Sequence, residues 1–198
     1  MVRTWASTIT FCACLVLHAQ EPVPYTGPGL LRASGTISPG FLLKQGTTNI
    51  YFGGKLEYFT DDKLSFRGEG LWYAGSQQKP APLLQNSQLS FGPFLHSVHG
   101  RLDLSAGVEA GISLVHPADV WIRTMEAPDQ PYADPAPPRA VPQASLCASL
   151  NYAVWDYLHF FVDVRLVHAV YNGSPEGALP LDEVILGAGL GWQLATKN

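Results

Sequence analysis

Residues 101–116, RLDLSAGVEAGISLVH, alternate strictly between apolar side chains and polar or small ones. The even positions from 102 to 114 carry only Leu, Ala, Val and Ile, whereas the odd positions carry Arg, Asp, Ser, Gly and Glu. Successive side chains of a β-strand point to opposite faces, so this stretch predicts a strand whose faces meet two different environments. A helix would repeat its apolar residues about every 3.6 positions, and glycines would weaken it.

The same pattern recurs along most of the chain. Eight strands are predicted, at residues 35–44, 49–59, 64–73, 88–97, 101–115, 143–154, 158–170 and 183–194. Each is near or above the roughly 9–11 residues that a tilted membrane strand needs. Beyond the N-terminal segment, no apolar run approaches the roughly 20 residues of a membrane helix. The sequence therefore predicts an all-β fold, an eight-stranded antiparallel up-and-down transmembrane β-barrel spanning residues 35–198.

The segments between the predicted strands alternate in length. The second, fourth and sixth, at residues 60–63, 99–100 and 155–157, are short. The third, fifth and seventh, at residues 74–87, 116–142 and 171–182, are long, and only the first, at 45–48, departs from this alternation. Short turns on one side and long loops on the other are typical of outer-membrane barrels.

The alternation alone leaves open which face points inward. A soluble ligand-binding barrel of the lipocalin kind would turn its apolar face inward, and a membrane barrel would turn it to lipid. The polar face is rich in small residues such as Ser105, Gly107 and Gly111, which suit a crowded interior better than a water-facing surface. Aromatic residues on or near the apolar face, towards strand ends, resemble interfacial girdles: Phe52, Tyr58, Trp72, Tyr152 and Trp192. These features favour the membrane barrel.

Charged residues of the polar face lie within the strands and can be paired. A hairpin centred on Asp62 places Glu57 opposite Arg67 and Lys55 opposite Glu69, whereas a shift of two residues brings like charges together. We therefore predict an interior charge network of Lys55, Glu57, Arg67, Glu69, Arg101, Asp103, Glu109, Asp163 and Arg165. Side chains fill the interior of an eight-stranded barrel, so this network is interpreted as structural filling, with a proton or ion path as the alternative.

The N-terminal residues have the features of an export signal. Arg3 precedes a short apolar core at residues 9–17, and Ala19 is a small residue at a plausible cleavage point. Residues 1–19 are therefore predicted to be a signal peptide, and residues 20–34, which carry three prolines, a periplasmic leader. Cleavage would leave Cys147 as the one cysteine, so no intramolecular disulfide is expected. The net charge of −4 excludes a basic footprint for nucleic acid.

Segments such as GVEAGI (107–112) and FVDVRLVH (161–168) make the chain resemble the small bacterial outer-membrane β-barrels of the OmpA/OmpX type. This resemblance implies an eight-stranded barrel in the outer membrane of a Gram-negative bacterium. Eight strands also argue against a wide pore. Such barrels usually end on a terminal aromatic residue. Here the candidate is Trp192, and residues 193–198 follow it.

His168 suggests a different function. The segment VRLVHAVYNG (164–173) resembles that of lipid A deacylases, which are outer-membrane hydrolases with a His, a Ser two residues later and a downstream acid. Position 170 is Val, so the nucleophile is missing, and Glu183 opens the last predicted strand. By parity His168 belongs to the lipid-facing set. His96 and Asp103 are expected to face each other across a turn, but no ligand set for a metal and no cofactor motif is found.

The longest loop, residues 116–142, carries Trp121, Met125 and Tyr132 among prolines. Long loops on a rigid scaffold commonly carry binding function, so these three residues are candidate contacts for a protein or glycan ligand. The sequence thus predicts a monomeric, non-enzymatic outer-membrane protein with a structural or surface-interaction role. Its partners are expected to be outer-membrane lipid and a ligand at the extracellular loops, and not nucleic acid. The alternatives are a lipid-modifying enzyme that uses His168 and a secreted soluble barrel.

Overall fold

The computed structural model describes residues 26–78, 81–118, 137–174 and 177–195. The predicted signal peptide and the first part of the leader lie outside these residues. The described residues form β1 (Leu30–Leu42), β2 (Thr47–Phe59), β3 (Leu64–Ser76), β4 (Leu83–His99), β5 (Leu102–Pro117), β6 (Arg139–Trp155), β7 (Leu158–Ser174), β8 (Gly177–Pro180) and β9 (Glu183–Ala195). None of them forms a helix with the length and hydropathy needed to cross a membrane.

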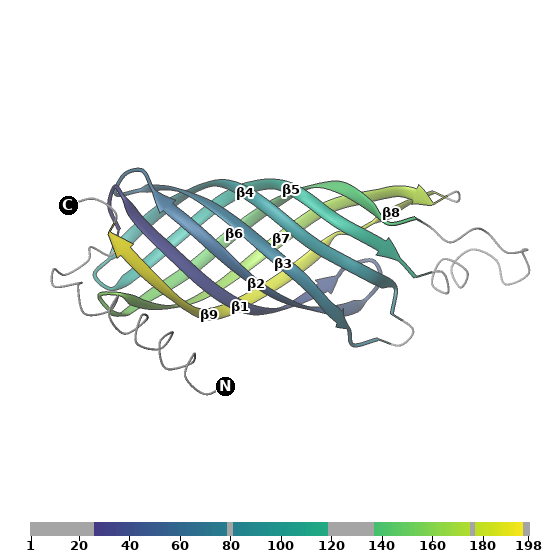
Figure 1. The fold of residues 1–198 in the computed structure, drawn as a ribbon, viewed down its shortest axis with the longest axis horizontal. Coiled ribbons are helices and arrows are strands. Elements are labelled where there is room, and N and C mark those ends of the chain that lie inside the picture. Colours follow the sequence, from purple (N-terminus) through teal and green to yellow (C-terminus); the bar gives the residue numbers. More distant parts are fainter. Residues whose placement is uncertain (1–25, 79–80, 119–136, 175–176, 196–198) are drawn as a thin grey trace, which may run out of the picture.

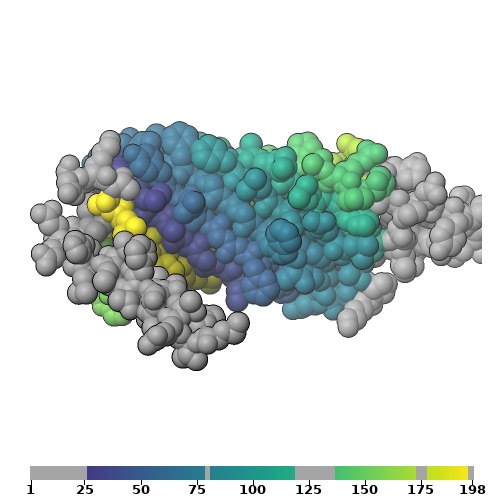
Figure 2. Space-filling model, in the orientation of Figure 1, coloured from purple at the N-terminus to yellow at the C-terminus, as the bar shows by residue number. Residues whose placement is uncertain are grey.

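The long strands close into a barrel (Figure 1). Each pairs antiparallel with its neighbours, β1 pairs with β9, and the β6–β7 pairing completes the ring. The space-filling view shows β9 (yellow) lying against β1 (purple) along this closure (Figure 2). The short strand β8 pairs only with the end of β7, in a separate sheet, so eight long strands make the wall. All eight predicted strands are confirmed.

The first strand begins earlier than predicted. It starts at Leu30, so residues 30–34 belong to the barrel and not to the leader. Three prolines, at positions 22, 24 and 28, led to a predicted strand start that is too late. All of them precede Leu30. Proline lacks the N–H that a paired strand needs, whereas residues 30–34 carry none and pair with both β2 and β9.

The two ends of the barrel differ. Both ends of the described chain lie at one end, with the tight connections β2–β3, β4–β5 and β6–β7 (Figure 1); we call it the turn end. Asp61 Oδ1 accepts hydrogen bonds from the backbone N–H of Lys63 and Leu64 at 2.7 and 2.8 Å, and Gly100 adopts a φ of 61°. The opposite, loop end carries the longer connections, as predicted.

One side of the barrel reaches further than the other at the loop end. The strands β1, β2, β3 and β9 have 13 residues each, whereas β4, β6 and β7 have 17 and β5 has 16. Figure 1 shows β4, β5, β7 and β8 running past the ends of the shorter strands. We call the loop ends of β4 to β7, together with β8, the raised wall.

The apolar face points outward on every side. On β5 the side chains of Leu104, Val108 and Ile112 are exposed, whereas Asp103 and Glu109 are buried. The five aromatic residues assigned to girdles, Phe52, Tyr58, Trp72, Tyr152 and Trp192, are all exposed. A soluble barrel would hide this apolar surface inside, so the soluble alternative is wrong. A wall of exposed Leu, Val, Ile and aromatic side chains around a polar interior is the arrangement that lipid requires.

Two glycines on opposite faces provide a test of this packing. At Gly92, an added Cβ would lie 1.9 Å from the backbone oxygen of Val108, which cannot move without parting the strands. At Gly35, on the outer face, an added Cβ would meet no atom within 4 Å. We expect Gly92→Ala to lower the free energy of unfolding by about 1–3 kcal/mol or more.

The matched control, Gly35→Ala, should be neutral or stabilise the barrel by up to about 1 kcal/mol, because alanine loses less entropy than glycine in a strand. Urea unfolding of the barrel in phospholipid vesicles measures both. Equal effects of the two substitutions would contradict the assignment of the faces.

Candidate functional site

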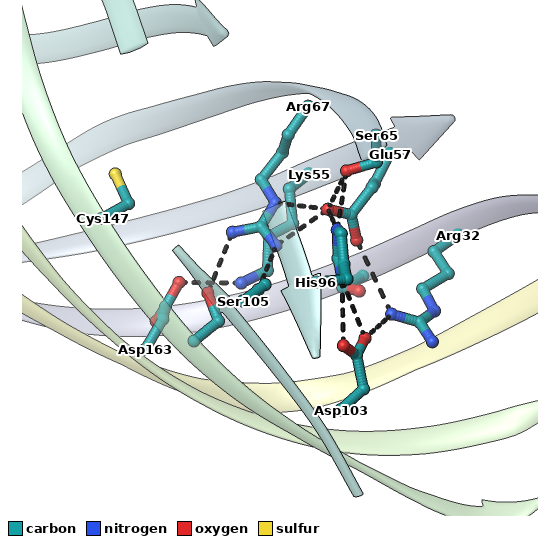
Figure 3. A network of polar contacts seen from close by, with 12 residues as sticks. Arg32, Lys55, Glu57, Ser65, Arg67, His96, Asp103, Ser105, Cys147 and Asp163 are labelled. Carbon is teal, nitrogen blue, oxygen red and sulfur yellow. Dashed lines mark hydrogen bonds and ion pairs between the residues drawn. The ribbon is translucent and has the colours of Figure 1, made fainter. Parts of the chain in front are cut away.

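The lumen holds a first group of charges near the turn end, the lower ion cluster of Arg32, Glu57, Arg67, His96 and Asp103 (Figure 3). Arg67 Nη2 donates to Glu57 Oε1 at 2.9 Å, and Arg32 Nη1 donates to Asp103 Oδ2 at 2.5 Å. The imidazole of His96 joins the two pairs, since Nδ1 lies 2.9 Å from Asp103 Oδ1 and Nε2 lies 3.4 Å from Glu57 Oε1. All five residues are buried.

Neutral groups complete the lower ion cluster. Ser65 Oγ donates to Glu57 Oε1 at 2.8 Å, and Arg67 Nη1 donates to Ser149 Oγ at 2.9 Å. The Arg67 guanidinium also lies over the ring of Phe94, 3.7 Å from its centroid. The buried guanidinium thus has an ion pair, hydrogen bonds to hydroxyls and an aromatic face, so that little of its hydrogen-bonding capacity is lost inside the barrel.

A second group of charges lies closer to the loop end. We call it the upper ion cluster, and it consists of Lys55, Glu69, Glu109, Asp163 and Arg165. Lys55 Nζ donates to Asp163 Oδ2 at 2.7 Å and lies over the ring of Phe161. Arg165 Nη2 forms ion pairs with Glu69 and, at 2.9 Å, with Glu109. These pairs span the lumen, because they join β2 to β7 and β7 to β3 and β5.

The predicted hairpin register is confirmed, with Glu57 opposite Arg67 and Lys55 opposite Glu69. Only the first of these opposed pairs is an ion pair, because Lys55 reaches across to Asp163 and Glu69 is bound by Arg165. Arg101 does not join the network. It lies in the exposed β4–β5 turn, where Nη1 donates to the backbone oxygen of Val154 at 3.3 Å. The predicted inclusion of Arg101 is therefore wrong, since the strand starts one residue later, at Leu102.

Arg32 was missed from the sequence because the leader was expected to cover it. The sequence could have indicated that Arg32 faces the lumen, since it occupies an even position of β1, as do the inward-facing residues Thr36 and Ser38. The expected contact between His96 and Asp103 is confirmed at 2.9 Å.

Glu183 is a buried carboxylate of a different kind. Tyr51 Oη donates to its two oxygens at 2.8 and 2.9 Å, and the side-chain amides of Asn49 and Gln88 donate at 3.0 and 3.1 Å. Within the described part of the chain it forms no ion pair, in contrast to the carboxylates of the two clusters. Neutral donors therefore take the place of a counter-charge at this level of the lumen.

Above Glu183, apolar side chains cross the lumen at the loop end. This apolar seal consists of Leu42, Leu83, Val115, Val141, Ala169, Tyr171 and Leu181, all buried. Leu42 on β1 and Val115 on β5 come from opposite walls of the eight-stranded ring, so the seal spans its full width. Parity could have predicted part of it, because Val115, Val141 and Ala169 continue the inward-facing positions of their strands with apolar residues.

On the outside of the barrel, His168 lies on the lipid-facing side, as predicted. Its side chain is 72% exposed, and its Nδ1 lies 2.6 Å from Asp182 Oδ1. The acid beside His168 is thus Asp182 and not Glu183, which faces the lumen. The outward-facing neighbours of His168 along β7 are Leu166 and Val170, neither of which is a nucleophile.

The remaining candidates from the sequence are the loop residues, Cys147 and a metal site. The predicted loop contacts Trp121, Met125 and Tyr132 lie outside the described residues. Cys147 is a buried free thiol whose sulfur lies 3.6 Å from Glu109 Oε2, which agrees with an interior residue. Among the residues that the structure describes, no group of three His, Cys, Asp or Glu side chains is placed to hold a metal ion.

The Lys55–Asp163 pair provides a test of the upper ion cluster. Removing one partner of a buried pair leaves an uncompensated charge, so Lys55→Met and Asp163→Asn should each destabilise the barrel by roughly 3–5 kcal/mol. The double variant should lose clearly less than the sum, with a coupling of about 1–3 kcal/mol. Urea unfolding in phospholipid vesicles measures the cycle, and simple additivity would argue against the pair.

No family model and no curated protein matches this sequence. Solved structures do match. The outer-membrane protein OprG of Pseudomonas aeruginosa aligns with a TM-score of 0.58 and 11% identity, over 86% of this chain and 98% of that chain. Neisserial surface protein A aligns with a TM-score of 0.56 and 10% identity, over 82% and 95%. The N-terminal β-barrel domain of Pseudomonas aeruginosa OprF aligns with a TM-score of 0.51 and 16% identity, over 85% and 99%.

At such low identity the likeness concerns the fold. The alignments cover nearly the full length of each barrel and most of this chain. Together with the outward apolar face, the filled lumen and the turn and loop ends, they identify the architecture. The chain has the fold of the small eight-stranded transmembrane β-barrels of the bacterial outer membrane.

Proposed function

We propose that this protein is a closed, non-enzymatic outer-membrane barrel with a structural or surface-interaction role. The observation that supports the proposal is that ion pairs and the apolar seal cross the lumen. The two ion clusters occupy its middle and turn end, and the apolar seal crosses its loop end. An interior that is crossed by ion pairs and an apolar cluster suits an anchor or scaffold better than a channel.

The raised wall supports a contact role on the cell surface. Turns of outer-membrane barrels face the periplasm and loops face outward, so the raised wall points away from the cell. Its strands carry the ends of the connection that contains residues 119–136. A rigid strand edge that lifts a long loop above the membrane is a scaffold on which binding residues are commonly placed. Export through the signal peptide of residues 1–19, with cleavage near Ala19, belongs to the same proposal.

A lipid-modifying enzyme is the second candidate, because the contact of His168 with Asp182 supplies the base and the acid of a hydrolytic triad. Hydrolysis by this route also requires a nucleophile within hydrogen-bond reach of the imidazole. The corresponding position of β7 is Val170. The pair therefore supports a role in binding more strongly than a role in cleavage.

The closed lumen predicts that the protein does not conduct ions. Inserted into planar phospholipid bilayers, the purified barrel should leave the current at baseline, because an ion would have to cross the apolar seal without water. A double substitution in the seal, Leu83→Ala with Tyr171→Ala, removes two large side chains. This variant should show channel openings. Regular stepwise openings of the unmodified barrel at low voltage would overturn the proposal.

The contact role predicts that residues 116–142 contribute to binding at the cell surface and not to the folding of the barrel. Replacing Trp121, Met125 and Tyr132 together by alanine should reduce the adhesion of cells that display the protein to a layer of the same cells. The heat-dependent gel mobility of the folded barrel should not change. Lys63→Ala, in the β2–β3 turn on the periplasmic side, is the control. Equal adhesion of the triple variant and the unmodified protein would remove these residues as contacts.

A further inference from the structure

The contact between His168 and Asp182 lies on the outer wall, where ionisable groups are costly at the middle of the bilayer and tolerated near its surfaces. Ionisable residues that face the membrane mark functional sites more often than they serve stability. Around the pair, the outward-facing residues are Leu166 on β7, Ala144 on β6 and Leu43 after β1. The main-chain N–H of Leu43 donates to the backbone oxygen of Asp182 at 2.9 Å, so the pair stands on a well-fixed part of the wall.

A shallow, open hollow of the outer wall borders this pair, and a second hollow of similar size lies over β2 to β5. The hollow beside the pair has a volume of about 540 Å³, and its outward-facing lining consists of Leu43, Val108, Ala144, Leu146, Leu166 and His168. The register explains part of its shape, because Ala144 on β6 pairs with His168 on β7, one row above the pairing of Leu146 with Leu166. The small side chain of Ala144 leaves a trough among Val108, Leu146 and Leu166, and the trough ends at the imidazole of His168.

The pair lies at the outer boundary of the apolar band. His168 follows Leu158, the first residue of β7 at the periplasmic end, by ten positions. At roughly 3.3 Å per residue and a tilt near 40°, this distance corresponds to about 25 Å along the barrel axis, the usual height of the apolar band. The trough therefore lies at the depth of lipid acyl chains in the outer leaflet, and the pair lies where the chains join their head group.

The charge of the pair restricts what it can recognise. Asp182 offsets any positive charge on His168, so the site lacks the net charge that would favour a phosphate. Because the carboxylate holds Nδ1, Nε2 is left to exchange a hydrogen bond with a neutral group. A hydroxyl or the carbonyl of an ester or amide fits this requirement, and these are the groups found at the root of an acyl chain.

We propose that this trough binds one acyl chain of an outer-leaflet lipopolysaccharide, with the hydroxyl or carbonyl group at the root of that chain bound by His168 Nε2. Lipopolysaccharide is chosen because the site opens towards the extracellular leaflet, which it occupies in Gram-negative bacteria. Binding of this lipid does not depend on contacts of the surface loops.

The test uses the refolded full-length mature chain in detergent micelles, with purified deep-rough lipopolysaccharide as the probe and native mass spectrometry as the readout. His168→Ala removes the polar contact and Ala144→Leu fills the trough. Each should weaken binding by about tenfold, His168→Ala through the loss of one hydrogen bond and Ala144→Leu because its side chain occupies the space of the acyl chain. Phosphatidylethanolamine in equal amount should not displace the bound lipopolysaccharide.

Two matched controls accompany these variants. Ala148→Leu makes the same change on the outer face of β6, outside the trough, and His99→Ala removes an exposed histidine near the periplasmic turn. Both should bind as the unmodified protein does, and folding is checked by heat-dependent gel mobility. Unchanged affinity of His168→Ala and Ala144→Leu, or equal displacement by phosphatidylethanolamine, would overturn the proposal.

The mass of the bound lipid separates this inference from the proposed function. Intact lipopolysaccharide on the barrel supports both. Lipopolysaccharide that loses one acyl chain only when His168 is present would support the binding site and overturn the non-enzymatic role. Channel openings in a barrel that still binds the lipid at His168 would overturn the closed lumen and leave the binding site standing.

Discussion

Closure of the sheet is the constraint on which the rest of the structure depends. A strand edge in lipid would leave backbone N–H and C=O groups without partners, at a cost of several kcal/mol each. The pairings of β1 with β9 and of β6 with β7 remove both edges. Once the ring is closed, each strand has one face towards lipid and one towards the lumen, and the alternation of residues 101–116 follows from this geometry.

Closure also brings charges inside that must be matched. The two ion clusters contain five carboxylates, which are bound by three guanidinium groups, one ammonium group and His96. Partners such as Lys55 and Asp163 come from β2 and β7, which are not neighbours in the ring. These contacts tie distant parts of the wall together, so the lumen acts as the core that a membrane barrel otherwise lacks.

Much of this could be predicted from the sequence, but only where the interaction is local. The Glu57–Arg67 pair follows from one hairpin and its register, and it was predicted. The choice of Asp163 over Glu69 as the partner of Lys55 depends on how far the ring is sheared and how deep each side chain lies, which no single hairpin determines. Asp182 lies just before β9, and only the fold shows that it reaches His168 on β7.

The same geometry limits where function can lie. Ion pairs and the apolar seal cross the lumen, so the outer wall is the other part of the described barrel where specific contacts can be made. Towards the loop end, the outer wall carries the raised wall and the trough that ends at His168. Both lie towards the same end of the barrel, and the trough is crossed by β6 and β7, two strands of the raised wall. A lipid held in the trough would therefore stand directly below the surface that the raised wall presents to the exterior.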